Sequence, residues 1–270
     1  MGVVTEQTTD TIDLTAVANF RDVGGVTTHD GRTVATGRLF RSAALGKASD
    51  DDIATLAGLG LRTVVDLRSV AEADAAPDPT IGDARGVLLD VLADAERISA
   101  PADLDKLIAN PEAVAAANDR LEQGSGVEHM IGAYRGLVNL PSAKRAYREF
   151  FTGLLDGVPT LFHCTAGKDR TGWAAASFLT LMGVDRDDVY SDYLRTNDLF
   201  LPAMAHVFDA FEAAGGDPDL LRPLLGVSAS YLNVAFDEVA IQYGSIGDYF
   251  AEALGISADE QDRMREQFLI

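Results

Sequence analysis

The sequence of 270 residues contains only one cysteine, Cys164. A lone cysteine cannot close an intramolecular disulfide, and it cannot supply the several thiolates of a cysteine-rich zinc or iron–sulfur site. Three of the four histidines, His29, His129 and His206, are scattered without the spacing typical of metal ligands. We therefore predict that the protein uses no metal and no organic cofactor, and that any chemistry of Cys164 is its own.

Basic residues are scarce as well. The chain has 22 Lys and Arg against 42 Asp and Glu, which gives a formal net charge of −20. Such a charge repels phosphate backbones and anionic lipid surfaces, and no run of Lys or Arg offsets it locally. We expect no nucleic acid among the partners.

Long apolar runs are also missing. The longest uncharged apolar stretch, residues 173–184, is too short to cross a bilayer. The first 14 residues carry three acidic side chains and no basic one, unlike a secretory signal. The sequence therefore predicts a cytoplasmic protein without integral membrane contact.

Apolar residues are nevertheless plentiful at 47%, which is enough for a packed core and excludes global disorder. The acidic segment 72–79 and the short segment 124–126 are interpreted as surface loops, and neither is long enough to be an interdomain linker. We therefore expect one domain over residues 1–270, with residues 1–18 as an N-terminal extension.

Apolar patterning predicts the fold class. Four short runs favour strands, at residues 37–42, 62–67, 86–92 and 160–164. Helical patterns separate them, at residues 51–59, 111–123 and 142–155. This alternation indicates an α/β fold with a mostly parallel sheet flanked by helices. After residue 164 the chain is predicted to be almost entirely helical, at 171–182, 186–195, 199–214, 219–225, 228–243, 246–254 and from a capping box at Ser257 onward.

Chemistry concentrates in residues 162–172, which read FHCTAGKDRTG. Cys164 ends a predicted strand, a short loop containing Gly167 follows, and Arg170 directly precedes the predicted apolar helix at 171–182. Backbone N–H groups of such a loop and the helix dipole favour a bound anion, and they would hold the Cys164 sulfur as a thiolate nucleophile. The loop at residues 165–170 is called the cradle below. Arg170 would clamp a phosphoryl group, and Thr171 would donate its hydroxyl to the sulfur. Cys-x5-Arg-Thr is the arrangement of phosphatases with a phosphocysteine intermediate.

The segment HCTAGKDRTG resembles the signature of the cysteine-dependent tyrosine and dual-specificity phosphatases. The segments NFRDVGG at 19–25, GRLFRS at 37–42, DLRS at 66–69, DYLRTND at 192–198 and YGSI at 243–246 are similar to the bacterial branch of that family. The resemblance implies a phosphatase-type α/β domain, with helices around 199–225 that fold over the pocket as a lid. It also implies substrate-binding roles for Thr165, Ala166, Gly167 and Lys168. The implied substrates are phosphotyrosine proteins and, in some members, phosphoserine or phosphothreonine proteins and phosphoinositides.

The general acid is harder to choose. The Trp-Pro-Asp loop of eukaryotic-type enzymes is absent, because the only tryptophan, Trp173, lies in the helix after the cradle. Asp169 lies within the loop itself. Asp94 and Asp90 follow the strand predicted at 86–92, where related enzymes carry their acid loop. We expect Asp169 or Asp94 to act as the catalytic acid, with Asp90 as the remaining candidate.

Other interpretations stay open. The same cradle would serve a catalytically silent phosphate-binding module, although an intact Cys164 and Arg170 argue against one. Another thiolate enzyme, such as an arsenate reductase or a sulfurtransferase, would also use it, although the arsenate route relays through further cysteines. The acidic and basic residues of the N-terminal motifs, Arg21, Asp22, Arg41, Asp66 and Arg68, are interpreted as structural ion pairs or caps.

Overall fold

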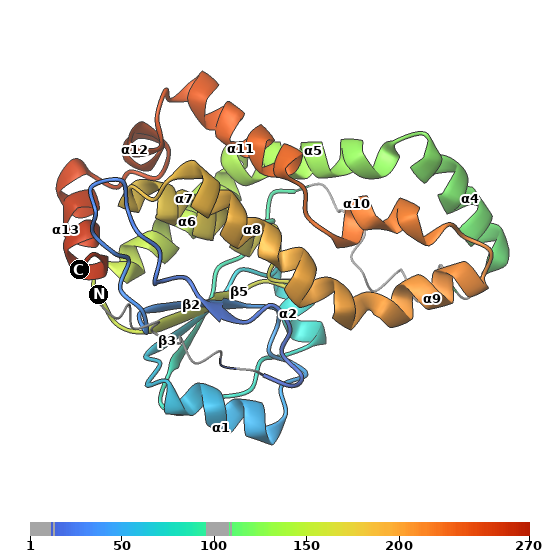
Figure 1. Ribbon diagram of the computed structural model, residues 1–270, viewed down its shortest axis with the longest axis horizontal. Helices are drawn as coiled ribbons and strands as arrows, with labels where there is room; N and C mark the ends of the chain where they lie inside the picture. Colours follow the sequence, from blue (N-terminus) through green and yellow to red (C-terminus); the bar gives the residue numbers. More distant parts are fainter. Residues whose placement is uncertain (1–11, 13, 96–107, 109) are drawn as a thin grey trace, which may run out of the picture.

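A computed structural model describes residues 12, 14–95, 108 and 110–270. Most of the expected N-terminal extension, residues 1–18, lies outside these described residues. The centre of the described part is a five-stranded sheet (Figure 1), with the order β1-β2-β5-β3-β4. Its strands are β1 (Arg21–Asp22), β2 (Leu39–Ser42), β3 (Thr63–Asp66), β4 (Arg85–Leu88) and β5 (Thr160–His163).

All neighbouring strands run parallel except β1, which pairs antiparallel with β2. The α/β class and the mostly parallel sheet predicted from the sequence are therefore confirmed. The two-residue strand β1 was not predicted, because two polar residues give no apolar run. Inner strands buried on both faces send alternate side chains to two separate cores, Leu39, Val65 and Phe162 to one and Phe40, Val64 and Leu161 to the other.

Helices cover both faces of the sheet (Figure 1). Helix α1 (Asp50–Gly58) lies on one face and begins at a capping box formed by Ser49 and Asp52. On the other face lie α6 (Pro141–Leu154), α7 (Arg170–Met182) and α8 (Arg186–Phe200). The last helix, α13 (Ala258–Phe268), packs beside α7, and its predicted capping box of Ser257 and Glu260 is confirmed.

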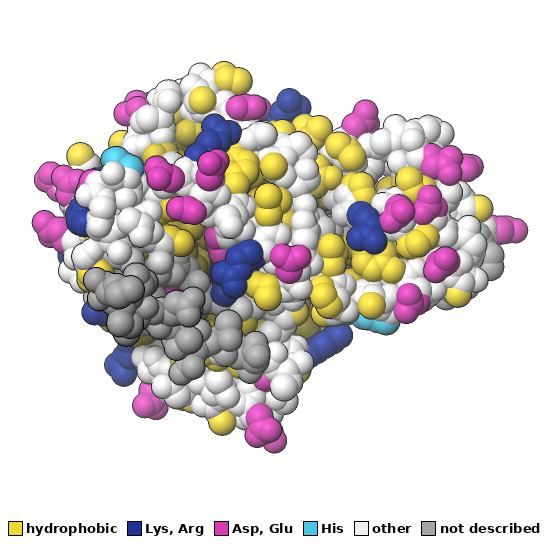
Figure 2. Space-filling model, viewed as in Figure 1, with side chains coloured by type: hydrophobic (Ala, Val, Ile, Leu, Met, Phe, Trp, Pro, Cys, Tyr) yellow, Lys and Arg dark blue, Asp and Glu magenta, His cyan; other side chains and the backbone are white. Residues whose placement is uncertain are grey.

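A group of helices extends away from the sheet and encloses a small apolar core of its own. It contains α4 (Pro111–Glu122), η2 (Leu201–Met204), α9 (Ala205–Ala213), η3 (Pro218–Leu221) and α10 (Arg222–Leu225). Its core contains Val114, Val207, Phe211 and Leu221. The helices expected around residues 199–225 are therefore present. Figure 2 shows apolar side chains lying among acidic ones on the surface over α9 and α10.

Two predicted surface loops are partly helical. Residues 76–79 form a loop as predicted, but residues 72–75 belong to helix α2 (Val70–Ala75), which begins at a capping box formed by Ser69 and Glu72. Residues 124–126 were also predicted as a loop, yet helix α5 (Ser125–Asn139) begins at Ser125, and only Gly124 takes a left-handed turn at φ 86°. Helix α5 as a whole was not predicted. It packs along α11 (Ala229–Gln242).

Between α11 and α13, the helical pattern at 246–254 is confirmed as the short helix α12 (Ile246–Asp248) and a π-helical turn, η4 (Tyr249–Ala253). One stretch of the described chain, Pro218–Gln242, is long and apolar enough to qualify as a membrane-spanning helix, with a mean hydropathy of 1.3. It is interrupted, because η3, α10 and α11 are separate helices and the backbone is extended at Gly226 and Ser228.

Candidate functional site

Cys164 lies at the carboxyl end of β5, the middle strand of the sheet. It is only 2% exposed, and it is followed by a loop that leads into α7 at Arg170. The carboxyl ends of parallel strands are where open α/β sheets bind their ligands. The sheet thus places the only cysteine of the chain at the position where a ligand is expected.

The loop after Cys164 has its carbonyl groups tied down on one side. Ala44 donates its N–H to the Thr165 oxygen at 3.1 Å. The Asn19 side-chain amide donates to the Ala166 and Gly167 oxygens at 3.1 and 2.9 Å. In a trans peptide the N–H points opposite to the C=O, and the described chain has no cis bond. The N–H groups of three successive peptides, those of Ala166, Gly167 and Lys168, therefore face away from these partners and form a nest for an anion.

Gly167 is needed at its position for two reasons. Its φ is 65°, a left-handed value that costs most residues energy. A Cβ built on it would also lie 2.2 Å from the Ser42 oxygen, closer than real contacts allow. The loop therefore packs directly on the end of β2.

A layer of buried charges supports the loop from below. Arg41 is fully buried and donates to the Gly167 oxygen at 2.8 Å and to Asp192 at 2.7 Å. Arg21 donates to Asp192 at 2.6 Å and to the Asn19 side chain at 2.6 Å. Burial alone would raise the pKa of Asp192, but Arg21 and Arg41 outweigh it and lower the pKa to about 2. Arg21 and Arg41 thus form structural ion pairs, and these ion pairs support the cradle.

Arg170 forms an ion pair with Glu72, which lies in the segment predicted as a loop at residues 72–79. Its Nη1 and Nη2 contact Glu72 Oε2 and Oε1 at 2.7 and 2.9 Å, and Nη2 also donates to the Thr165 hydroxyl at 3.3 Å. Burial alone would raise the pKa of Glu72, but its bonds with Arg170 outweigh burial and lower that pKa well below its usual range. Burial would lower the pKa of Arg170, but the Cys164 sulfur and Glu72 outweigh it and raise the pKa. Both side chains are therefore charged at neutral pH.

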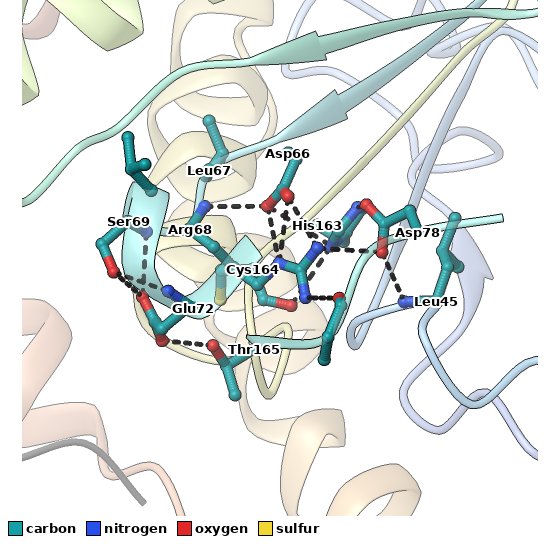
Figure 3. Close-up of polar contacts among 12 residues, drawn as sticks. Leu45, Asp66, Leu67, Arg68, Ser69, Glu72, Asp78, His163, Cys164 and Thr165 are labelled. Atoms are coloured by element: carbon teal, nitrogen blue, oxygen red, sulfur yellow. Dashed lines mark hydrogen bonds and ion pairs between the residues drawn. The ribbon is translucent and has the colours of Figure 1, made fainter. Parts of the chain in front are cut away.

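Figure 3 shows how Glu72 reaches this position. Glu72 accepts hydrogen bonds from the Ser69 N–H and hydroxyl, both at 2.9 Å, and it accepts another from the Thr165 hydroxyl. The capping box that begins α2 thus fixes the carboxylate beside Cys164 and Thr165.

His163 precedes the nucleophile position and is fully buried. Its Nε2 lies 2.9 Å from Asp78 Oδ2, and its Nδ1 lies 3.3 Å from the Cys164 carbonyl oxygen. Arg68 contacts both neighbouring carboxylates, Asp66 at 2.7 Å and Asp78 at 3.0 Å (Figure 3). Asp66, Asp78 and His163 are close enough together to hold a metal ion, but the Arg68 guanidinium already supplies the positive charge between the two carboxylates. The group is thus a buried ion-pair network behind the cradle.

Lys168 and Asp169 lie at the end of the loop, directly before Arg170. Lys168 is 7% exposed, and its Nζ lies 2.8 Å from Asp169 Oδ2 and 3.3 Å from the Gly226 oxygen. Asp169 Oδ1 also accepts a hydrogen bond of 2.9 Å from the Tyr134 hydroxyl. Lys168 therefore links the loop to the segment between α10 and α11, and Asp169 is held from two sides.

Within the described chain, neither of the other two acid candidates forms a hydrogen bond or ion pair with Lys168 or Asp169. Asp94 is exposed; its backbone N–H donates to the Ser142 hydroxyl, and its carboxylate lies 3.3 Å from the exposed Arg145. Asp90 is half-buried and accepts from the N–H of Val70 at 3.1 Å, beside the start of α2. Of the three candidates, Asp169 is the one in contact with other residues of the loop.

Thr171 occupies the second position of α7 and is fully buried. Within the described chain its hydroxyl has no hydrogen-bond partner. The predicted hydrogen bond from Thr171 to the Cys164 sulfur is therefore not formed. The Thr171 hydroxyl is buried and unpaired next to the cradle.

Comparison with known proteins shows which family the chain belongs to. Residues 12–270 match the tyrosine phosphatase family. The chain belongs to that family. The predicted family and enzyme class, a protein-tyrosine phosphatase, are thereby confirmed.

Two relatives are similar to this tyrosine phosphatase family member over most of their length. The triple specificity protein phosphatase PtpB of Mycobacterium tuberculosis is 33% identical, over 94% of this chain and 97% of that protein. A Cupriavidus necator protein that carries the name of a tyrosine-protein phosphatase is 32% identical, over 89% of this chain and 82% of that protein. Among solved structures, Pseudomonas aeruginosa TpbA in complex with pTyr matches 77% of this chain and 90% of that one, with 18% identity and a TM-score of 0.30, which is too low to carry structural detail.

Sequence reasoning missed three residues that hold the loop in place. Glu72 had a usable signal, since Ser69-x-x-Glu72 has the spacing of a capping box. Asn19 had a weaker one, because it begins the NFRDVGG motif and its φ is 61° in the structure, a value that Asn tolerates better than most residues. Tyr134 stands out in the sequence only as a candidate substrate contact or helix-surface residue, and nothing there indicates its hydrogen bond to Asp169.

Proposed function

We propose that this protein hydrolyses phosphate monoesters through a phosphocysteine intermediate, with phosphotyrosine in proteins as the main substrate class. The observation that carries the proposal is the nest of three inward N–H groups directly after Cys164, with the Arg170 guanidinium beside it. Donors fixed in advance around a phosphoryl group stabilise the charge of its transition state.

In the first step the Cys164 sulfur attacks phosphorus in line, and an S–P bond forms while the P–O bond to the leaving group breaks. The loop amides and Arg170 hold the three equatorial oxygens. The leaving oxygen takes a proton from Asp169. In the second step Asp169 takes a proton from water, the water oxygen bonds to phosphorus, and the S–P bond breaks to give inorganic phosphate and the free thiolate.

We assign the acid role to Asp169 because it lies at the end of the loop, whereas Asp94 pairs with Arg145 on the surface. In the free protein Asp169 contacts Lys168 at 2.8 Å. A bound phosphate dianion would draw Lys168 toward itself and repel a charged Asp169. Asp169 would then be released from Lys168, and its carboxyl would be free to reach the leaving oxygen.

Three further points belong to the same proposal. The buried Lys168 would favour highly charged phosphoinositide headgroups as a second substrate class. The helices at 199–225 would act as a lid, since Lys168 reaches the Gly226 oxygen at their end. We place the protein in the cytoplasm as a single domain that needs no metal and no organic cofactor.

The test is phosphate release from an aryl phosphate and from a phosphotyrosine peptide. We expect Cys164→Ser to abolish turnover while inorganic phosphate still binds. We also expect Arg170→Lys to lower kcat/KM strongly, because lysine lacks the planar fork. Arg186→Lys, at an exposed position on α8, is the matched control. Full activity of Cys164→Ser would overturn the proposal, as would a wild type that binds phosphorylated ligands without turnover.

A further inference from the structure

Two buried phenols form a chain that ends on Asp169. Tyr134 on α5 donates its hydroxyl hydrogen bond to Asp169 Oδ1 at 2.9 Å. The Tyr193 hydroxyl on α8 lies 2.5 Å from the Tyr134 hydroxyl. Both side chains have no exposed surface. Tyr134 and Tyr193, which are far apart in sequence, thus lie together beside Asp169, the carboxylate that would donate the catalytic proton.

The direction of this chain follows from counting protons. Each phenol has one proton to donate, and a charged carboxylate only accepts. The Tyr134 proton therefore goes to Asp169, the stronger acceptor, and the Tyr193 proton goes to the Tyr134 oxygen. Burial raises the pKa of Tyr134 and of Tyr193 well above the ordinary value, so both remain donors throughout the working pH range.

The packing leaves these phenols no freedom to turn away. The rings of Tyr134 and Tyr193 meet edge to face with centroids 6.3 Å apart, and the Tyr231 ring lies 5.9 Å from Tyr134. Gly172 on α7 approaches Tyr193 so closely that an added Cβ would lie 3.1 Å from the ring. Lys168, the other donor to Asp169, is a flexible chain that can move onto a bound phosphate.

We propose that Tyr134 is a positioning residue that fixes the orientation and proton affinity of Asp169 during turnover, and that Tyr193 holds Tyr134 in place. The proposal rests on the proposed function, and within it on Asp169 as the acid. When Lys168 turns to the phosphate, the Tyr134 hydroxyl is the contact that continues to hold Asp169 Oδ1. The other carboxylate oxygen then faces the leaving group.

Several other charged or titratable groups act on Asp169. They come from the loop and from five helices: Lys168, Arg170 on α7, Tyr134 on α5, Tyr147 on α6, Tyr193 on α8 and Tyr231 on α11. Tyr134→Phe removes one hydroxyl and keeps the other five of these side chains. A change in the pH profile after that substitution therefore reports on the Tyr134 contact.

The experiment compares wild type with Tyr134→Phe on phenyl phosphate and on p-nitrophenyl phosphate across the pH range. Loss of the Tyr134 hydroxyl removes a hydrogen bond that stabilises the charged Asp169 carboxylate. The pH at which kcat declines on the alkaline side should therefore rise by about half to one unit. We expect kcat to fall roughly 10-fold for phenyl phosphate, whose leaving group needs the proton, and less for p-nitrophenyl phosphate. KM should change little.

Tyr193→Phe should give the same shift with a smaller size, and it carries the test if Tyr134→Phe does not fold. Tyr190→Phe is the matched control, because Tyr190 also lies on α8 but bonds to Asn233 at the surface; its profile should match the wild type. A folded Tyr134→Phe with an unshifted profile, or with equal losses on both substrates, would overturn the proposal. Wild-type protein without turnover would instead overturn the proposed function.

Discussion

The carboxylate of Glu72 and the guanidinium of Arg170 meet in two parallel contacts of 2.7 and 2.9 Å. The pair uses the Nη1 and Nη2 edge of the guanidinium. Within the described chain Nε makes no hydrogen bond, and Nη2 donates its second proton to the Thr165 hydroxyl at the long distance of 3.3 Å. A phosphoryl group that binds the edge formed by Nε and Nη2 would take the place of this Thr165 contact. Glu72 thus acts on the site by fixing which edge of Arg170 faces the cradle.

Glu72→Gln should lower kcat/KM for an aryl phosphate by roughly 10- to 100-fold, because a charge-assisted bidentate pair is lost and an amide N–H₂ then faces the guanidinium donors. The binding of inorganic phosphate should weaken in parallel. Glu128→Gln, at an exposed position in the first turn of α5, is the control and should behave as wild type. Steady-state kinetics on the folded variants checks this, and equal kcat/KM for the two variants would show that Glu72 has no positioning role.

Gly167→Ala should abolish turnover and lower the melting temperature. The added Cβ would lie 2.2 Å from the Ser42 oxygen, at a backbone φ of 65°, so the loop must move off β2. Gly153→Ala is the matched control: it lies in α6 with nothing within 4 Å of the added Cβ. There we expect a gain in stability of about 0.5–1 kcal/mol and unchanged activity. Thermal melting and turnover of both variants test the close approach, which would be refuted if Gly167→Ala remained fully active.

Asp192 should make the fold sensitive to acid over a defined range. Its pKa in the folded protein is lowered to about 2 by Arg21 and Arg41, against about 3.9 for an ordinary Asp. Its stabilisation is therefore complete above about pH 4 and is lost as the pH falls through about 2, a contribution of about 2.6 kcal/mol.

Asp192→Asn should remove that contribution at neutral pH and leave two buried guanidinium groups without their partner. The difference in unfolding free energy between wild type and Asp192→Asn should then shrink as the pH falls from about 4 toward 2. Chemical denaturation at several pH values measures it. A difference that stays constant over this range would mean that the ion pairs do not lower the pKa of Asp192.

The three acid candidates can be separated by leaving group. Asp169→Asn should lower kcat on phenyl phosphate by about 100-fold or more and affect p-nitrophenyl phosphate less, because only the poorer leaving group depends on a proton. Asp94→Asn and Asp90→Asn should remain close to wild type. If Asp94→Asn instead showed the leaving-group dependence, the acid would belong to the segment after β4.

The sequence alone predicted those features that leave a local pattern. Strands β2, β3 and β5 are short apolar runs because they are buried on both faces, and such runs are visible without a structure. The motif around Cys164 and Arg170 is contiguous, so its residues could be assigned from spacing. Helix α5 escaped prediction, since its glycines and mixed surface weaken the helical pattern.

The rest of the site depends on contacts that sequence order does not show. Asn19 reaches Ala166 and Gly167 across 147 and 148 residues, and Glu72 reaches Arg170 across 98. Only the folded sheet brings these segments together. Asp94 was placed near the site by its position after a strand, but the chain turns there and pairs it with Arg145.

The central claim is that Cys164 lies at the base of a nest that binds a phosphate anion, and alkylation by iodoacetate tests it most directly. Cys164 is the only cysteine, so every alkylation event reports on it. We predict that iodoacetate modifies Cys164 in the folded protein and that inorganic phosphate slows the modification by occupying the nest. Modification of Cys164 at the same rate with and without phosphate would contradict the account.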